Sequence, residues 1–465
     1  MDKPKTLGEL KQSGYRPLSV KAELRKNLIK KMLDREPLFP GIFGFEETVI
    51  PQLQNAILAG QDMIFLGERG QAKTRLIRSL TSLLDPWIPY VEGSEINDDP
   101  FAPISKYAKE LTAKHGDETP IAWLAQEDRY GEKLATPDVT TPELIGEMDP
   151  IKVAEGRYLS DELVIHYGLV PRTNRGIFCI NELPDLSEKL QVGLFNIMQE
   201  RDIQIRGFRV RLPLDICVVA SANPEDYTNR GRIITPLKDR YGAQIRTHYP
   251  KNIAVEIDIM EAERSLLLDG DGYRITVPQF MKEIVAETTS MAREHADINQ
   301  RSGVSVRMSI ANYESLIGNA LRRTILLRED EVVPRISDLP SILPSSSGKI
   351  ELETVEEGKE GQIIEELLKK AVKQVFSRHF KLEDFTDFLR NFADGKSLEI
   401  SDTMPTAVYS QKVRGMAGLT KVLQRLNGAD SPAATASALE FVLEGLHLNK
   451  KLNKKTVEGE ISYWG

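Results

Sequence analysis

Short apolar runs separated by stretches with helical spacing dominate the chain between Pro40 and about Pro250. These runs are rich in Ile, Val and Phe, are bounded by Gly, Pro, Asp or Asn, and cover residues 62–68, 87–93, 176–182, 215–223 and 243–250. Their length and composition predict buried β-strands. Because buried strands that alternate with helices usually form parallel sheets covered on both faces, we expect an α/β fold around a parallel five-stranded sheet.

Beyond Pro250 the apolar residues recur mainly at helical spacing. Residues 253–268, 277–296 and 305–327 predict a small all-helical domain, and three later amphipathic segments predict a helical C-terminal region. The stretch between them is rich in Ser, Pro, Glu and Gly, which is typical of linkers and exposed loops. We therefore expect a basic amphipathic N-terminal arm, an α/β core, an all-helical domain, a linker or loop and a helical C-terminal region, over residues 1–37, 38–250, 251–335, 336–361 and 362–465.

Composition narrows the class of protein. The chain has 465 residues, which suggests about three domains. Its net charge of −8, from 69 acidic and 61 basic residues, argues against a nucleic-acid-binding surface that extends over the whole protein. No apolar run approaches the roughly 18 residues of a membrane span, and the start lacks an apolar signal core, so we expect a cytoplasmic protein. Cys179 and Cys217 lie in apolar runs and are expected to be core residues.

The strongest chemical signal follows the first predicted strand. Residues 67–74, Gly-Glu-Arg-Gly-Gln-Ala-Lys-Thr, fit the phosphate-loop pattern except that Ala72 replaces the usual glycine. Glycines let the backbone turn tightly and aim N–H groups at phosphate oxygens, while Lys73 would neutralise the phosphates and Thr74 would ligate Mg²⁺. A strand-to-helix turn with an accidental lysine is the alternative. We expect ATP to bind at Gly67, Glu68, Arg69, Gly70, Gln71, Ala72, Lys73 and Thr74.

Polar residues at the ends of two later strands complete a candidate ATPase site. Glu182 is the candidate general base, and Asn181 stands where an aspartate that coordinates magnesium is usual. An asparagine can still bind Mg²⁺ through its carbonyl oxygen, but it brings no negative charge. Asn223 follows the next strand and could orient the attacking water. Arg240 and Arg307 are candidate catalytic arginines, although each could be an ordinary surface side chain.

In this order and spacing, the motifs resemble those of AAA+ ATPases. The resemblance covers about residues 38–325 and is to the branch that holds the magnesium chelatase I subunit and the MoxR proteins. The phosphate loop with alanine before the lysine has the MoxR-type form. The branch's helix-2 insertion, second motif, arginine-finger segment and sensor-2 segment are matched by residues 144–174, 181–207, 237–242 and 305–307.

The resemblance implies an AAA+ core followed by a helical lid. It makes Glu182 the hydrolytic glutamate and Asn223 the sensor-1 residue. Arg240 would be the finger that reaches the ATP of the adjacent subunit, and Arg307 the sensor-2 contact from the lid. Residues 41–47, with Phe43 and Gly44, would line the adenine pocket. The resemblance also implies a homo-oligomer, a hexameric ring.

Members of this branch typically work with a separate protein that carries a von Willebrand factor A domain. We therefore expect an ATP-driven ring that remodels a protein client or drives metal insertion. The alternatives are a nucleotide-dependent scaffold with little turnover, a transcriptional-activator-type ATPase and a DNA motor. Residues 144–150 do not match the GAFTGA loop of such activators, the acidic balance disfavours a DNA motor, and the six histidines lack metal-ligand spacing.

Overall fold

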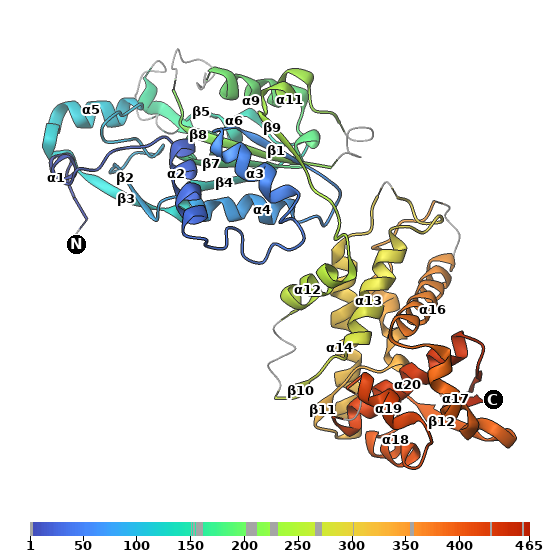
Figure 1. Ribbon diagram of the computed structural model, residues 1–465. Coiled ribbons are helices and arrows are strands. Elements are labelled where there is room, and N and C mark those ends of the chain that lie inside the picture. Colours follow the sequence, from blue (N-terminus) through green and yellow to red (C-terminus); the bar gives the residue numbers. More distant parts are fainter. Residues whose placement is uncertain are drawn as a thin grey trace. The chain divides into compact units, whose positions relative to one another are not determined.

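The chain divides into two compact units in the computed structural model, Met1–His248 and Tyr249–Gly465. The structure describes residues 3–149, 151, 154, 161–200, 212–223, 231–265, 272–300, 302–353, 358–427, 430–457 and 460–465. Part of the expected helix-2 insertion (144–174) and the end of the segment matched to the second motif (181–207) lie outside the described residues. Figure 1 labels the helices and strands of both units.

A five-stranded sheet forms the centre of the first unit, in the order β4-β7-β8-β1-β9. All four pairings in this sheet are parallel. The predicted α/β fold with a parallel five-stranded sheet is therefore confirmed. The strands are β1 (Met63–Leu66), β4 (Tyr130–Leu134), β7 (Gly176–Asn181), β8 (Ile216–Ala222) and β9 (Ala243–Arg246).

Helices cover both faces of this sheet (Figure 1). One face packs alternate strand residues such as Phe65 and Cys179 against α2, α3 and α4. The other face packs residues such as Ile64 and Phe178 against α9 and α11. Because both faces are buried, the central strands are continuously apolar rather than alternating. The helices are α2 (Val20–Leu33), α3 (Val49–Leu58), α4 (Lys73–Ser79), α9 (Glu188–Glu200) and α11 (Thr235–Arg240).

The apolar run at residues 87–93 forms a strand, but not in the parallel sheet. Strand β2 (Trp87–Val91) instead pairs antiparallel with β3 (Ile121–Ala125) in a separate two-stranded sheet. The fifth parallel strand is β4, with the sequence YGEKL. This strand lies at the edge of the sheet and carries polar side chains, so a search for apolar runs does not find it.

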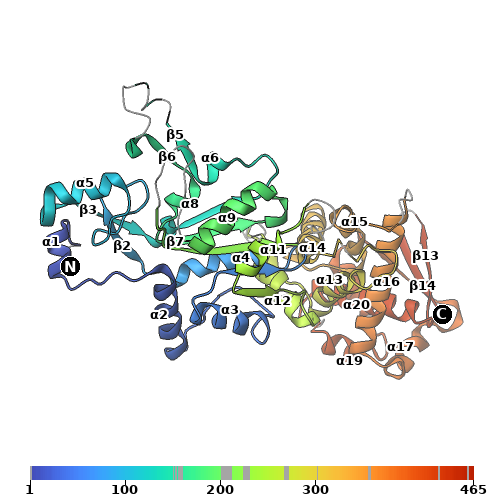
Figure 2. The same cartoon turned by 90° about the horizontal axis from the view of Figure 1, so that it is seen from above.

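The remaining elements of the first unit surround this framework. A two-stranded hairpin of β5 and β6 follows α6, and Figure 2 shows it outside the layer of parallel strands. The N-terminal arm packs on the unit, since Val20, Leu24 and Leu28 of α2 are buried in its core. The other elements are α1 (Leu7–Gln12), α5 (Lys106–His115), α6 (Thr141–Leu144), β5 (Gly146–Met148), β6 (Ile165–Tyr167) and α8 (Leu169–Arg172).

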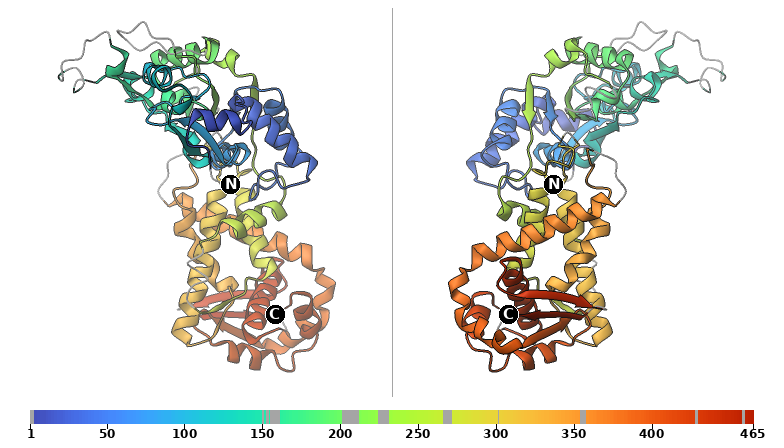
Figure 3. Two further views of the ribbon diagram at one scale, coloured as in Figure 1. Left: turned by 90° about the vertical axis from the view of Figure 1, so that its left-hand side faces the viewer. Right: turned by 90° about the vertical axis from the view of Figure 1, so that its right-hand side faces the viewer.

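The second unit is mainly helical. Its long helices α13, α14, α16 and α20 bury apolar faces against one another, and Figure 3 shows α16 in orange against this bundle. The helices are α12 (Ile253–Glu263), α13 (Gln279–Ala292), α14 (Val306–Leu327), α15 (Leu343–Ser346), α16 (Lys359–His379), α17 (Thr386–Leu389), α18 (Thr406–Val413), α19 (Leu419–Arg425) and α20 (Pro432–Leu448).

Strands also occur in this unit, which the sequence did not predict. Two short strands, β10 (Arg274–Ile275) and β11 (Glu331–Val332), pair in parallel. A three-stranded antiparallel sheet joins β12 (Ser397–Ser401), β14 (Glu460–Trp464) and β13 (Asn453–Val457). The basic chain end therefore contributes a strand.

One hydrophobic core extends through the whole second unit, from Ile257 to Tyr463. The segment expected as a linker or loop is partly built into it: residues Ile336–Ile342 form a 3-10 helix that continues into α15. Asp338 of this segment is fully buried, and it accepts hydrogen bonds from Arg323 and from the backbone of Arg335. The Ser- and Pro-rich composition here reflects a short buried connection rather than an exposed linker.

Among the described residues, no helix is both long and apolar enough to cross a membrane.

A buried ion pair fastens the N-terminal arm to the first unit. Arg129 donates to Glu23 of α2 through Nη1 at 2.7 Å and Nη2 at 2.6 Å. Both side chains are almost fully buried, at 1% and 3% exposure. Removing one partner of such a pair leaves a buried charge without compensation, which costs about 3–5 kcal/mol.

We predict that Glu23→Ala lowers the free energy of unfolding by about 3–5 kcal/mol in chemical denaturation. The matched control is Lys11→Ala, because Lys11 pairs with Asp117 at the surface, where the two side chains are 50% and 66% exposed. That substitution should cost about 0–1 kcal/mol. An equally small loss in both variants would show that the buried pair does not hold the arm.

Candidate functional site

The carboxyl ends of β1, β7 and β8 lie level with one another at one edge of the sheet. In the register of the strands, Leu66 is opposite Ala222 and Ile180 is opposite Ala220. The phosphate loop and Asn223 therefore leave neighbouring strands at the same height, with Asn181 and Glu182 beside them. Three of the predicted motifs are brought together by the parallel pairing alone.

The phosphate loop connects β1 to α4. Gly70 and Ala72 both have left-handed backbones, with φ of 74° and 53°. Glycine adopts this conformation freely, whereas a residue with a Cβ gives up about 1–2 kcal/mol. Lys73 begins α4 and is only 7% exposed. Its Nζ donates to the carbonyl of Gly67, and to that of Glu68 at 2.8 Å, so the lysine closes over its own loop.

Thr247, which the sequence motifs did not include, packs against this loop from the end of β9. Its N–H donates to Leu66 O at 2.9 Å, and its hydroxyl donates to Gln71 Oε1 at 2.8 Å. A Cβ at Gly67 would lie 1.9 Å from Thr247 Oγ1. Position 67 therefore requires glycine, because the side chain of Thr247 leaves no room for a Cβ there.

Glu182 has a left-handed backbone with φ of 54°. Its N–H donates to Ser221 Oγ at 3.2 Å, and the Ser221 hydroxyl donates to Asn181 Oδ1 at 3.1 Å. Asn181 in turn donates through Nδ2 to Glu132 on β4, at 2.6 Å from Oε1. A row of hydrogen bonds thus crosses β4, β7 and β8 and ends at the backbone N–H of the candidate base.

Glu132 is the acidic residue beside Asn181. Arg78 of α4 donates to both of its carboxylate oxygens, at 2.8 and 2.9 Å, and the hydroxyl of Tyr130 donates at 2.8 Å. The bonds from Arg78 lower the pKa of Glu132, which outweighs the opposing effect of its partial burial. Glu132 is therefore ionised near neutral pH. Burial raises the pKa of Cys179, opposite Glu132, to about 12, so this thiol stays neutral.

The other predicted residues occupy several elements. Asn223 is 1% exposed and directly follows β8. Gly41, near Phe43 and Gly44, lies against α4, since a Cβ on it would meet the guanidinium of Arg75. The contact of Phe43 and Gly44 with adenine stays a prediction of the sequence.

The two candidate arginines lie in different units. Arg240 ends α11, where Nε and Nη2 donate to Gln199 Oε1 at 3.2 and 2.9 Å, and its guanidinium lies 5.1 Å from the ring centre of Phe195. Arg307 belongs to the second unit, in the first turn of α14, and is exposed. Within the first unit, the structure brings the phosphate loop together with Asn181, Glu182 and Asn223.

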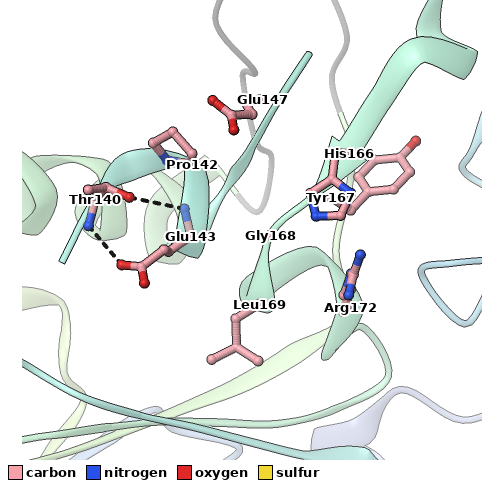
Figure 4. A pocket seen from close by; sticks show the side chains of 9 residues that line it. All are labelled: Thr140, Pro142, Glu143, Glu147, His166, Tyr167, Gly168, Leu169 and Arg172. Carbon is pink, nitrogen blue, oxygen red and sulfur yellow. Dashed lines mark hydrogen bonds between the residues drawn. The ribbon is translucent and has the colours of Figure 1, made fainter. Parts of the chain in front are cut away.

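A separate pocket of about 620 Å³ lies at the base of the β5–β6 hairpin (Figure 4). Thr140 and Glu143 form a capping box on its wall, with bonds of 3.0 and 3.4 Å. Its lining contains no residue of the loop 67–74. Among the described residues, no group of three His, Cys, Asp or Glu could hold a metal ion. The phosphate loop remains the better candidate site.

Sequence comparison relates the chain to magnesium-chelatase subunits. It is 27% identical to the magnesium-chelatase subunit ChlI of Nostoc sp. over 55% of this chain and 64% of that protein. It is 25% identical to the magnesium-chelatase 38 kDa subunit of Cereibacter sphaeroides over 50% and 66%. The match with ChlI of Mesostigma viride is 23% identical and covers 70% and 89%. The chain thus spans slightly less than two thirds of the first two relatives. No protein-family model matches the chain.

Solved structures give weaker likenesses. BchI, in a model of the BchI–BchD complex of magnesium chelatase, is 18% identical with a TM-score of 0.35, over 71% of this chain and 98% of that chain. NtrX from Brucella abortus in complex with ATP is 12% identical with a TM-score of 0.36, over 78% and 68%. These scores are too low to show a shared arrangement of the whole chain.

The order of the parallel strands, the phosphate loop and the polar strand ends give the first unit the fold expected of an AAA+ core. Within that class, the chain is a relative of the magnesium-chelatase I subunits.

Proposed function

We propose that this chain binds ATP at residues 67–74 and hydrolyses it as the motor of a ring. The observation that carries the proposal is the strand register, which supports placing the phosphate loop, Glu182 and Asn223 around one nucleotide. The relationship to magnesium-chelatase I subunits supports the same reaction. ATP hydrolysis, the ring and its partners are proposals drawn from these two sources.

The loop has the hydrogen-bond donors and the positive charge that bind a nucleoside triphosphate. The first turn of α4 leaves N–H groups without partners inside the helix, and they carry the positive end of its dipole. Lys73 is buried against two carbonyls, which it would exchange for phosphate oxygens. Phe43 and Gly44 are proposed to contact the adenine. Mg²⁺, when bound, would neutralise phosphate charge, and Thr74 with Asn181 would hold it.

Hydrolysis needs a base and an oriented water. The proposed base is Glu182, which would accept the proton of the attacking water while Asn223 fixes the position of that water. The left-handed backbone of Glu182 and its bond to Ser221 hold the start of this side chain in place. The reaction yields ADP and phosphate.

Assembly is proposed to complete the site. In a hexameric ring, Arg240 would leave Gln199 and stabilise the transition state on the adjacent subunit, and Arg307 would contact nucleotide from the lid. The names of the relatives support a role in magnesium chelatase. Metal insertion together with a separate von Willebrand factor A protein is proposed from the sequence motifs, and remodelling of a protein client is the broader alternative. A cytoplasmic location stays a prediction of the sequence.

We predict that Glu182→Gln lowers the rate of ATP hydrolysis by at least about a hundredfold, because a general base contributes 10²–10⁴-fold. Nucleotide affinity, measured by calorimetry, should stay nearly unchanged since the loop is intact. Glu188→Gln, at an exposed position in α9, is the matched control and should retain wild-type turnover. If the wild-type protein shows no turnover in any oligomeric state and Glu182→Gln changes nothing, the nucleotide-dependent scaffold is the correct alternative.

A second prediction concerns Arg240. Arg240→Ala alone should lower turnover by about 10³-fold or more, the contribution of a finger supplied by a neighbour. Mixing it with Glu182→Gln should restore activity, because some interfaces then combine an intact Glu182 with an intact Arg240. The control mixes Arg240→Ala with a protein that carries both Arg240→Ala and Glu182→Gln. In that mixture no interface has an intact Arg240. Absence of rescue in the first mixture would remove Arg240 from the role across the interface.

A further inference from the structure

The carboxamide of Asn181 is engaged at both ends. Its Nδ2 lies 2.6 Å from Glu132 Oε1, and its Oδ1 accepts from the hydroxyl of Ser221 at 3.1 Å. An ionised carboxylate only accepts hydrogen bonds, so the group facing Glu132 must be the amide nitrogen. The oxygen of Asn181, which could bind a metal, is consequently the atom turned toward Ser221.

Glu132 is held firmly in this position. Arg78 binds it through two parallel bonds, Tyr130 adds a third donor and Asn181 a fourth. Such a bidentate pair fixes the plane of a carboxylate as well as its charge. Arg78 lies one helical turn after Thr74 on α4, on the same face of the helix. The carboxylate of Glu132 is therefore fixed on β4 as one half of an ion pair with Arg78, beside the strand whose end carries Asn181.

An aspartate at position 181 would not fit this arrangement. It would put a carboxylate oxygen where the amide nitrogen now lies, 2.6 Å from an oxygen of Glu132. Two carboxylates at this separation cannot both stay ionised without a large penalty. Asparagine at 181 and glutamate at 132 are thus matched: one supplies the donor, the other supplies the charge.

The same row of bonds ends at the proposed base. Ser221 donates to Asn181 and accepts from the N–H of Glu182, so hydrogen bonds connect Glu132 to the backbone of Glu182 through two side chains. A left-handed backbone at a residue with a Cβ costs about 1–2 kcal/mol and persists only where its surroundings hold it.

We infer that Glu132 is a positioning residue of this site: its carboxylate, one strand away, fixes the carboxamide of Asn181, and hydrogen bonds through Ser221 connect Asn181 to the backbone of Glu182. Asn181 contributes by its amide geometry rather than by charge. The inference rests on the proposed ATP hydrolysis for its catalytic meaning, whereas the pairing of Glu132 with Asn181 belongs to the protein without nucleotide.

Exchanging the two side chains tests this directly. Four proteins are compared: wild type, Asn181→Asp, Glu132→Gln and the double variant. We expect each single substitution to lower turnover and the two together to restore it. Asn181→Asp sets two acids face to face and Glu132→Gln removes the charge, so each should lower turnover by about tenfold or more. The double variant returns one acid and one amide to the pair, and it should recover to within about threefold of wild type.

Two readouts separate position and charge from mere stability. The Mg²⁺ concentration that half-saturates ATP binding should rise about tenfold in Glu132→Gln and fall back in the double variant. The unfolding midpoint of the nucleotide-free protein should fall in Asn181→Asp and recover in the double variant. Asn55→Asp and Glu127→Gln, which change exposed residues, control for the altered net charge and should match the wild type.

Three results would overturn the inference: Asn181→Asp as active as the wild type, losses that simply add in the double variant, or an unchanged Mg²⁺ requirement in Glu132→Gln. If none of the four proteins hydrolyses ATP, the proposed function fails instead. The unfolding midpoints alone then test the pairing of Glu132 with Asn181. Coupling between the two substitutions supports the pairing, and additive effects contradict it.

Discussion

The parallel pairing of β1, β7 and β8 is the constraint on which the site depends. It places the ends of three strands level with one another, so that the loop 67–74, the acid Glu182 and the amide Asn223, which lie far apart in the sequence, meet at one edge. A slip of one residue in this register would turn each strand-end side chain to the opposite face of the sheet. Helices on both faces oppose that slip, because the buried apolar residues of the strands divide between two cores.

Electrostatics adds a second constraint at the same edge. The site has an amide where an acid is usual, and the acid stands on the neighbouring strand, held by Arg78 and Tyr130. Hydrogen bonds through Asn181 and Ser221 connect that charge to the backbone of Glu182. Asn181 departs from the common pattern, and we propose that Glu132 on the neighbouring strand compensates for this difference.

Sequence alone predicted the parts of this site that have strong local signals. The strands β1, β7 and β8 are apolar and bounded by turn residues, and the loop 67–74 has a recognisable pattern. The edge strand β4 was missed because Glu132 and Lys133 interrupt its apolar character. Thr247 and Ser221 act only through partners that lie 176 and 40 residues away in the chain. Such contacts depend on sheet order, which no local pattern contains.

The second unit shows the same limit. Its helices follow the apolar spacing, but the strand β13 carries Lys454 and Lys455 and reads as a basic tail until β14 pairs with it. Likewise, the Ser- and Pro-rich stretch around Asp338 resembles a linker because its burial depends on Arg323, 15 residues earlier. In both places a partner distant in sequence decides the local structure.

The central claim is that nucleotide binds at loop 67–74 while Glu132 and Asn181 keep their pairing. An experimental structure of Glu182→Gln with ATP and Mg²⁺ tests it most directly. We expect Lys73 Nζ on phosphate oxygens instead of the carbonyls of Gly67 and Glu68, and Asn181 still bonded to Glu132 and Ser221. Phosphates bound elsewhere, or loss of the hydrogen bond between Asn181 Nδ2 and Glu132, would contradict the account.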